Sequence, residues 1–184
     1  MKSLNLCILF LAANLAVGAT PGASEAKPAL LVYGEGFVFG VSEPLGWKGD
    51  TEKAGGFHVN IVFFPSSPES RNADVTIRVR LNRKVDENTA ADLQYDMDEY
   101  KQNYPKVQFS DLSFKHPSYP VFEKVFFVPK SFFEYVAYLN PGAGVKFTLS
   151  AAMSVRGRAA SEAELSAFES VVASLKLLKP APAG

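Results

Sequence analysis

The sequence contains few of the residues that build metal centres and catalytic thiols. Its 184 residues include one cysteine, Cys7, and two histidines, His58 and His116. A zinc or copper site would therefore need carboxylates for most of its ligands, and no His-Glu-x-x-His spacing is present. We expect neither a metal site nor a bound cofactor.

An excess of charge of either sign is also missing. Nineteen Lys and Arg residues balance nineteen Asp and Glu residues, and 47% of the chain is hydrophobic. This composition excludes the low hydrophobicity and high net charge of a disordered chain, and it excludes the basic excess of a nucleic-acid binder. We expect a folded globular domain without a nucleic-acid partner.

Motifs of nucleophilic catalysis are absent from the sequence as well. There is no Gly-x-Ser-x-Gly elbow and no Ser-x-x-Lys with the lactamase-type motifs that accompany it. Gly34-Glu35-Gly36 does not have the pattern of a phosphate loop, because a strand rather than a helix is expected to follow it. No catalytic residue is therefore assigned, and the protein is not expected to be an enzyme.

No apolar run is long and unbroken enough to cross a bilayer, which takes about 20 residues. The N-terminus instead has the basic start, apolar core at residues 4–17 and small-residue exit of a signal peptide. Cleavage after Ala19 or after Ala26 satisfies the small-residue rule, and we expect residues 1–19 to be removed. The product would be periplasmic or extracellular, with no transmembrane segment after processing and, since Cys7 is lost, no thiol.

An alternation of apolar and polar residues dominates the remaining chain. Residues 75–82 and 145–156 alternate most regularly, which places apolar side chains on one face of each strand and polar ones on the other. Pro129-Lys130-Ser131 is expected to turn a hairpin. Seven strands are predicted, over residues 37–42, 57–64, 75–82, 107–114, 121–128, 132–139 and 145–156.

Two segments have a helical period instead. In the first, residues 89–104, an apolar stripe is expected to face the core and the acidic residues Asp92, Asp96 and Glu99 to face solvent. The second begins at Ser161, which forms a capping box with Glu164.

Strand runs with two segregated helices predict an α+β fold. We expect a mainly antiparallel sheet of about seven strands with two packed helices, in an α/β/α-sandwich-like arrangement. This single domain is placed at residues 30–178, after a flexible leader at 20–29 and before a disordered tail at 179–184.

One polar patch on the predicted sheet is a candidate binding site. His58 and Asn60 share a face of their strand, and pairing of neighbouring strands would bring Arg78 and Arg80 beside them. Arginine forks in such a patch suit an anion or an acidic partner. The alternative is an ordinary solvent-facing sheet surface, which antiparallel sheets commonly have.

The order of these elements resembles that of the PsbP-like fold over residues 37–178. The resemblance rests on that order and on the segments Phe39-Gly-Val-Ser-Glu-Pro-Leu-Gly-Trp47, Tyr135-Val-Ala-Tyr138 and Val171-Val-Ala-Ser-Leu175. This group includes an extrinsic photosystem II subunit, a Ran-binding nuclear import factor and exported bacterial proteins of unassigned role. The resemblance implies core anchors at Trp47 and Phe168, and a binding or accessory role rather than catalysis.

Three functions remain open at this point. The preferred one is an exported, non-catalytic binding or accessory protein that holds a protein partner or small ligand on a sheet face, or on the aromatic hairpin of Phe126, Phe127, Phe132 and Phe133. The second is a carrier with an apolar pocket between sheet and helix. The third is a hydrolase that depends on His58 and a carboxylate. The sequence assigns no oligomeric state.

Overall fold

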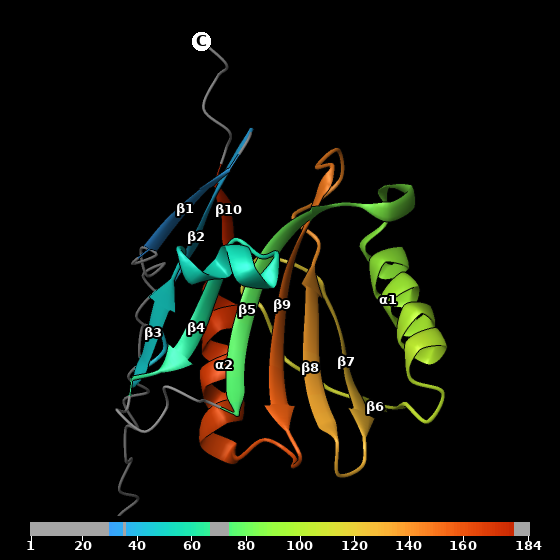
Figure 1. The fold of residues 1–184 in the computed structure, drawn as a ribbon. Coiled ribbons are helices and arrows are strands. Elements are labelled where there is room, and N and C mark those ends of the chain that lie inside the picture. The colour runs from blue at the N-terminus through green and yellow to red at the C-terminus, as the bar shows by residue number, and fades with distance from the viewer. Residues whose placement is uncertain (1–29, 35, 67–73, 179–184) are drawn as a thin grey trace, which may run out of the picture.

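A computed structural model describes residues 30–34, 36–66 and 74–178 of the chain (Figure 1). The strands are β1 (Leu30–Gly34), β2 (Phe37–Val41), β3 (Trp47–Asp50), β4 (Ile61–Pro65), β5 (Val75–Arg83), β6 (Gln108–Asp111), β7 (Val121–Val128), β8 (Phe132–Leu139), β9 (Phe147–Arg156) and β10 (Lys176–Leu178). The helices are α1 (Thr89–Asn103), α2 (Glu162–Ser174) and the short 3-10 helices η1 (Lys53–Phe57) and η3 (Val85–Glu87). The predicted signal peptide, leader and tail lie outside the described residues.

The strands form two antiparallel sheets, which with the two α-helices confirm the α+β class. The main sheet has seven strands in the order β3-β4-β5-β9-β8-β7-β6, and the small sheet has three in the order β1-β2-β10. The hairpin between β7 and β8 turns at residues 129–131, as predicted, with Lys130 at a φ of 63°.

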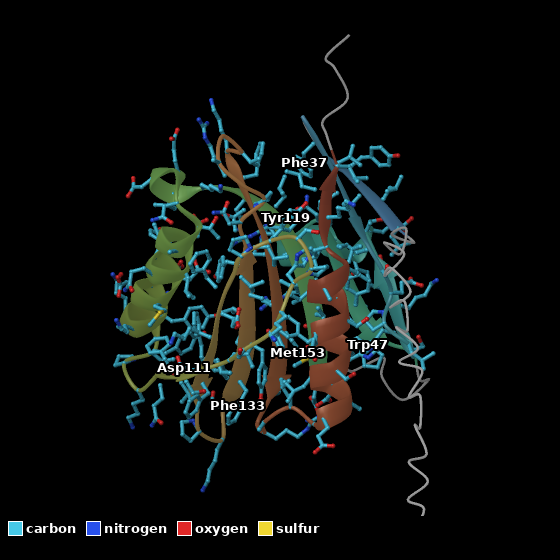
Figure 2. The ribbon with its side chains drawn as sticks, turned by 180° about the vertical axis from the view of Figure 1, so that it is seen from behind. Phe37, Trp47, Asp111, Tyr119, Phe133 and Met153 are labelled. Carbon is cyan, nitrogen blue, oxygen red and sulfur yellow. The ribbon has the colours of Figure 1, made fainter. Side chains whose placement is uncertain are left out.

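The largest core lies between the main sheet and α2. Along β5 the alternation predicted from the sequence is confirmed, since Val75, Ile77, Val79 and Leu81 are buried. Met153 of β9, labelled in Figure 2 beside α2, is fully buried on the same side. Strand β2 of the small sheet contributes further buried side chains to this cluster, so the small sheet packs on the α2 side of the molecule.

Helix α1 covers the opposite face of the main sheet, over β7 and β8 (Figure 1). Its apolar contacts form a second, smaller core around Leu93, Phe126, Val136 and Tyr138. The sheet therefore lies between two helices, as predicted. Because α1 covers only one end of its face, the β5 and β9 part of that face is left for other elements.

The strand predicted over residues 57–64 begins only at Ile61, and the first part of that prediction is wrong. Lys53–Phe57 form η1 instead, and His58 follows with a left-handed backbone, φ 54° and ψ 40°. Gly55 and Gly56 explain the difference, because two successive glycines disfavour an extended strand and permit a tight turn. Helix η1 consequently lies over β4, in front of the sheet in Figure 1.

Helix α2 begins as predicted. The Ser161 hydroxyl accepts a hydrogen bond from the Glu164 amide, and the Glu164 carboxylate accepts one from the Ser161 amide. Arg158 donates two further hydrogen bonds of 2.7 Å to the same carboxylate. These contacts, the Arg158 pair first, lower the pKa of Glu164 to about 2.

Candidate functional site

A groove lies on the α1 face of the main sheet, between η1 on one side and α1 on the other. Its volume is about 350 Å³. The lining residues are Phe57, Val59, Arg78, Arg80, Asp96, Glu99, Tyr100, Asn103, Tyr104, Glu134, Val136, Tyr138, Ser150 and Ala152. Strands β5, β9 and β8 form its floor, and the two helices form its walls.

The groove exists because the middle strand of its floor carries small side chains. In the register of the sheet, Ser150 of β9 lies between Arg80 of β5 and Tyr138 of β8. Ala152 occupies the next position along β9 on the same face. Since the side chains of a strand alternate between faces, large residues on both flanks of small ones leave a trough along β9.

A partly buried ion pair holds the floor together. The Arg78 Nη2 atom donates to Glu134 Oε1 and, at 2.7 Å, to Ser154 Oγ. Tyr100 of α1 donates its hydroxyl to the other Glu134 oxygen, Oε2. Both oxygens of a carboxylate that is only 9% exposed are therefore satisfied, and α1 is tied to the sheet at this point.

Two carboxylates of α1 also contact the sheet, so the prediction that Asp92 and Asp96 face solvent is wrong. Thr148 of β9 donates to Asp92, and Tyr138 of β8 donates to Asp96. The sheet face beneath α1 carries hydroxyl groups, which explains why an acidic side of the helix can pack there. Burial raises the pKa of the Asp96 carboxyl, and burial together with Asp96 raises the pKa of the Tyr138 hydroxyl.

We expect Asp96→Asn to reduce the pH dependence of folding. The folded-state pKa of Asp96 is raised, so its contribution to stability is complete below the unfolded value of about 3.9 and is lost as the pH rises through the folded value. The variant should therefore lose less stability than the wild type as the pH rises above about 4. Urea unfolding at several pH values measures this.

The control for this prediction is Glu169→Gln, which changes an exposed carboxylate on α2, outside the groove. Tyr138→Phe should destabilise the protein by about 1–3 kcal/mol, because it leaves the Asp96 carboxylate without its donor. An Asp96→Asn profile parallel to that of the wild type would contradict the prediction.

The structure separates the four residues of the predicted patch. Arg78 and Arg80 both line the groove, on the same face of β5. Asn60 uses its side-chain oxygen to accept a 2.8 Å hydrogen bond from the Leu81 amide. His58 is exposed in the turn after η1 and is not among the lining residues. Two members of the patch thus belong to one site, and two lie beside it.

Sequence reasoning missed Phe57, Asp96, Tyr100 and Glu134 as members of the site. Glu134 is the one that left a signal, since it is the single charged residue in the apolar run of β8, Phe132–Leu139. A buried charge in such a run needs a partner from another element. The partners come from segments far away in the chain, so the sequence alone could not supply them.

The side chains of the aromatic hairpin are fully or half buried by contacts within the protein. Phe126 is fully buried and contacts the rings of Tyr100 and Phe109 edge to face. Phe127 stacks on Phe133, and both pack against the α2 core. The groove is therefore a better candidate for a binding surface than the hairpin.

The second histidine, His116, has a structural set of contacts. Its Nδ1 atom accepts hydrogen bonds from the amides of Ser118 and Tyr119, which leaves Nε2 to donate to the carbonyl oxygen of Leu175 at 2.9 Å. Burial lowers the pKa of this imidazole. His116 thereby links the loop before β7 to the end of α2.

Searches for other kinds of site are negative within the described segments. No group of three or more His, Cys, Asp or Glu side chains there is arranged to hold a metal ion. None of the helices in the described ranges is long and apolar enough to span a membrane. Comparison of the chain with protein-family models and with curated proteins finds no match.

Proposed function

We propose that the protein is an exported, non-catalytic binding protein that holds a small ligand in the groove on the α1 face of its main sheet. The observation that carries this proposal is the groove itself. Its volume of about 350 Å³ falls in the range of small-molecule sites, roughly 300–1,000 Å³. Its lining is more polar than that of most such sites, with five charged side chains beside aliphatic and aromatic ones, and this suits a ligand that carries a polar group.

The construction of the groove supports a preformed site. Its floor is three hydrogen-bonded strands, and α1 is anchored to that floor through Tyr100 to Glu134 and through Asp96 to Tyr138. A site that is already ordered before binding avoids the entropic cost of ordering it on binding. These contacts support ligand binding as the role of this face.

Three titratable groups of the groove, Glu134, Tyr100 and Tyr138, support binding over catalysis. Both oxygens of Glu134 are engaged, and the pKa values of the Tyr100 and Tyr138 hydroxyls are raised, so these phenols stay protonated at neutral pH. Efficient proton transfer favours a group whose pKa is near the working pH. A hydrolase that depends on His58 would have to act outside this groove, since His58 does not line it.

The charged lining also favours a ligand with a polar group over the wholly apolar ligand of a simple carrier. Arg78, Arg80, Asp96, Glu99 and Glu134 all contribute to the groove surface. Export rests on the sequence of residues 1–19, and membership of the PsbP-like group stays a prediction based on element order.

Filling the groove tests the proposal. Ala152 lines the floor, so Ala152→Phe places an aromatic ring where the ligand would lie. We expect native mass spectrometry to detect a low-molecular-mass adduct on the wild-type protein after incubation with a small-molecule cell extract, and the variant to lose most of it.

Ala163→Phe, at an exposed position of α2, is the matched control and should keep the adduct. Circular dichroism would verify that both variants are folded. An adduct retained by Ala152→Phe, or absent from the wild type, would refute binding in the groove.

A further inference from the structure

We infer that the ligand of the groove is a small organic monoanion, a carboxylate on a flat apolar body, with the carboxylate held by Arg80. This inference rests on the proposed binding function and names the ligand class. It depends on which groups of the groove are already engaged and which are open.

Arg80 is the open cation of the groove. It lies two positions after Arg78 on the same face of β5, and its side chain is exposed. Among the residues that the structure describes, no carboxylate, amide or hydroxyl forms a hydrogen bond or ion pair with its guanidinium. Arginine presents its donors in a planar fork that matches a carboxylate, so an open guanidinium in a groove suits that group.

Arg78 gives a second, independent indication that the ligand carries a hydrogen-bond acceptor. Its Nη2 atom is engaged by Glu134 and Ser154, but its Nε atom is buried and has no acceptor among the described residues. Buried donors are almost always paired in folded proteins, so an unpaired one in the floor of a groove calls for an acceptor from outside the chain. Residues two apart on a strand are about 7 Å apart, close enough for one ligand to meet both arginines.

The balance of charge disfavours a ligand with two negative charges. Arg78 and Arg80 face three carboxylates in the lining, Asp96, Glu99 and Glu134. Glu134 already neutralises Arg78, which leaves Arg80 as the cation beside Asp96 and Glu99. A phosphate dianion would bring a second negative charge close to Asp96 and Glu99, and like charges at short range repel.

The remaining lining indicates an apolar body for the ligand. Val59, Val136 and Ala152 provide aliphatic surface in the groove. Phe57 and Tyr104 contribute ring surface that is 40% and 46% exposed. Exposed rings next to an aliphatic floor suit a flat apolar group, which gains both burial and ring contacts.

The inference is tested with benzoate, its neutral isostere benzamide and inorganic phosphate, each titrated into isotope-labelled protein and followed by amide NMR shifts. We expect benzoate to shift amides of residues 78–80 and 150–152 with a millimolar dissociation constant, and benzamide and phosphate to bind more weakly. Arg80→Gln should weaken benzoate about tenfold or more, since it removes a charge-assisted contact, and should leave benzamide unchanged.

Two further variants sharpen the test. Arg156→Gln removes an exposed arginine outside the groove and should bind benzoate like the wild type. Asp96→Asn removes a carboxylate whose charge interacts with Arg80, and it should bind benzoate more tightly than the wild type. Loss of benzoate binding in Arg156→Gln equal to that in Arg80→Gln would overturn the assignment to Arg80.

The outcomes separate this inference from the proposed function. If benzamide binds as tightly as benzoate, if phosphate does, or if Arg80→Gln has no effect on benzoate, the monoanion inference falls. If benzoate and benzamide bind equally well and Ala152→Phe abolishes the binding of both, the groove is still a binding site and only the monoanion inference is wrong. Absence of any shift at the groove amides with all probes would count against both.

Discussion

Replacing Phe168 by alanine is expected to lower the free energy of unfolding by about 3–5 kcal/mol. Phe168 lies in the middle of α2 and is 0% exposed. Its ring contacts Phe114 edge to face, with the ring centroids 5.5 Å apart, and packs in the cluster that joins α2 to both sheets. Truncation removes this apolar contact and leaves a cavity that a densely packed core cannot close fully.

Urea unfolding followed by circular dichroism measures the effect of Phe168→Ala. A loss of 3–5 kcal/mol is a large part of the total of roughly 5–15 kcal/mol for a typical domain, so the variant is expected to unfold at much lower denaturant concentration. Phe57→Ala is the matched control, because the same side chain is removed from a position that is 40% exposed. Equal losses in the two variants would show that burial of Phe168 is not what stabilises the fold.

The Phe168 position could be predicted from the sequence, and the reason is its local pattern. Phe168, Val172 and Leu175 follow Ser161 at helical spacing, and a capping box marks where the helix begins. Regular alternation likewise revealed β5 and β9. Patterns of this kind depend only on residues that are close in the sequence, so they can be recognised without knowing the tertiary structure.

The elements that sequence reasoning missed lack such signals. β1, β3 and β10 have three to five residues each, too few for alternation to stand out. Their extended form depends on partners distant in the chain, since β10 pairs with β2. The turn that removes His58 from the predicted strand depends instead on Gly55 and Gly56, a local signal that was outweighed by the apolar residues after it.

Only the arginines of the site could be predicted from the sequence, and the reason is related. The arginines of β5 could be placed on one face by their period of two, but nothing local distinguishes Arg78 from Arg80. The difference arises from Glu134 of β8, which reaches Arg78 across β9. One arginine thus becomes part of the floor, while the other has no ion-pair partner among the described residues.

Replacing Glu134 by alanine is expected to destabilise the protein by about 3 kcal/mol. The variant leaves the Arg78 charge, in a side chain only 26% exposed, without a counter-ion, and it leaves the Tyr100 hydroxyl without its acceptor. Breaking a buried pair typically costs about 3–5 kcal/mol, and the partial exposure of Arg78 places this one at the lower end. Urea unfolding measures the loss.

The double variant Arg78→Met with Glu134→Leu is the control for this interpretation. It removes both charges, so the desolvation cost disappears with the attraction, and it should be less destabilised than Glu134→Ala alone. The single variants Arg78→Met and Glu134→Leu complete the comparison. A loss of stability in the double variant that equals the sum of the losses in these two would contradict a direct interaction between Arg78 and Glu134.

Glu134→Ala and Phe168→Ala are also expected to increase local opening in different elements of the structure. Phe168 belongs to the α2 core, whereas Glu134 ties α1 to the sheet through Tyr100. Hydrogen exchange under native conditions is expected to increase in α1 for the Glu134 variant, because local opening draws on the contacts that hold that element. Since α1 forms one wall of the groove, the same variant should weaken ligand binding even at temperatures where the main sheet stays folded. Unchanged protection of α1 would show that its attachment depends on the apolar contacts of Leu93 and Phe126 instead.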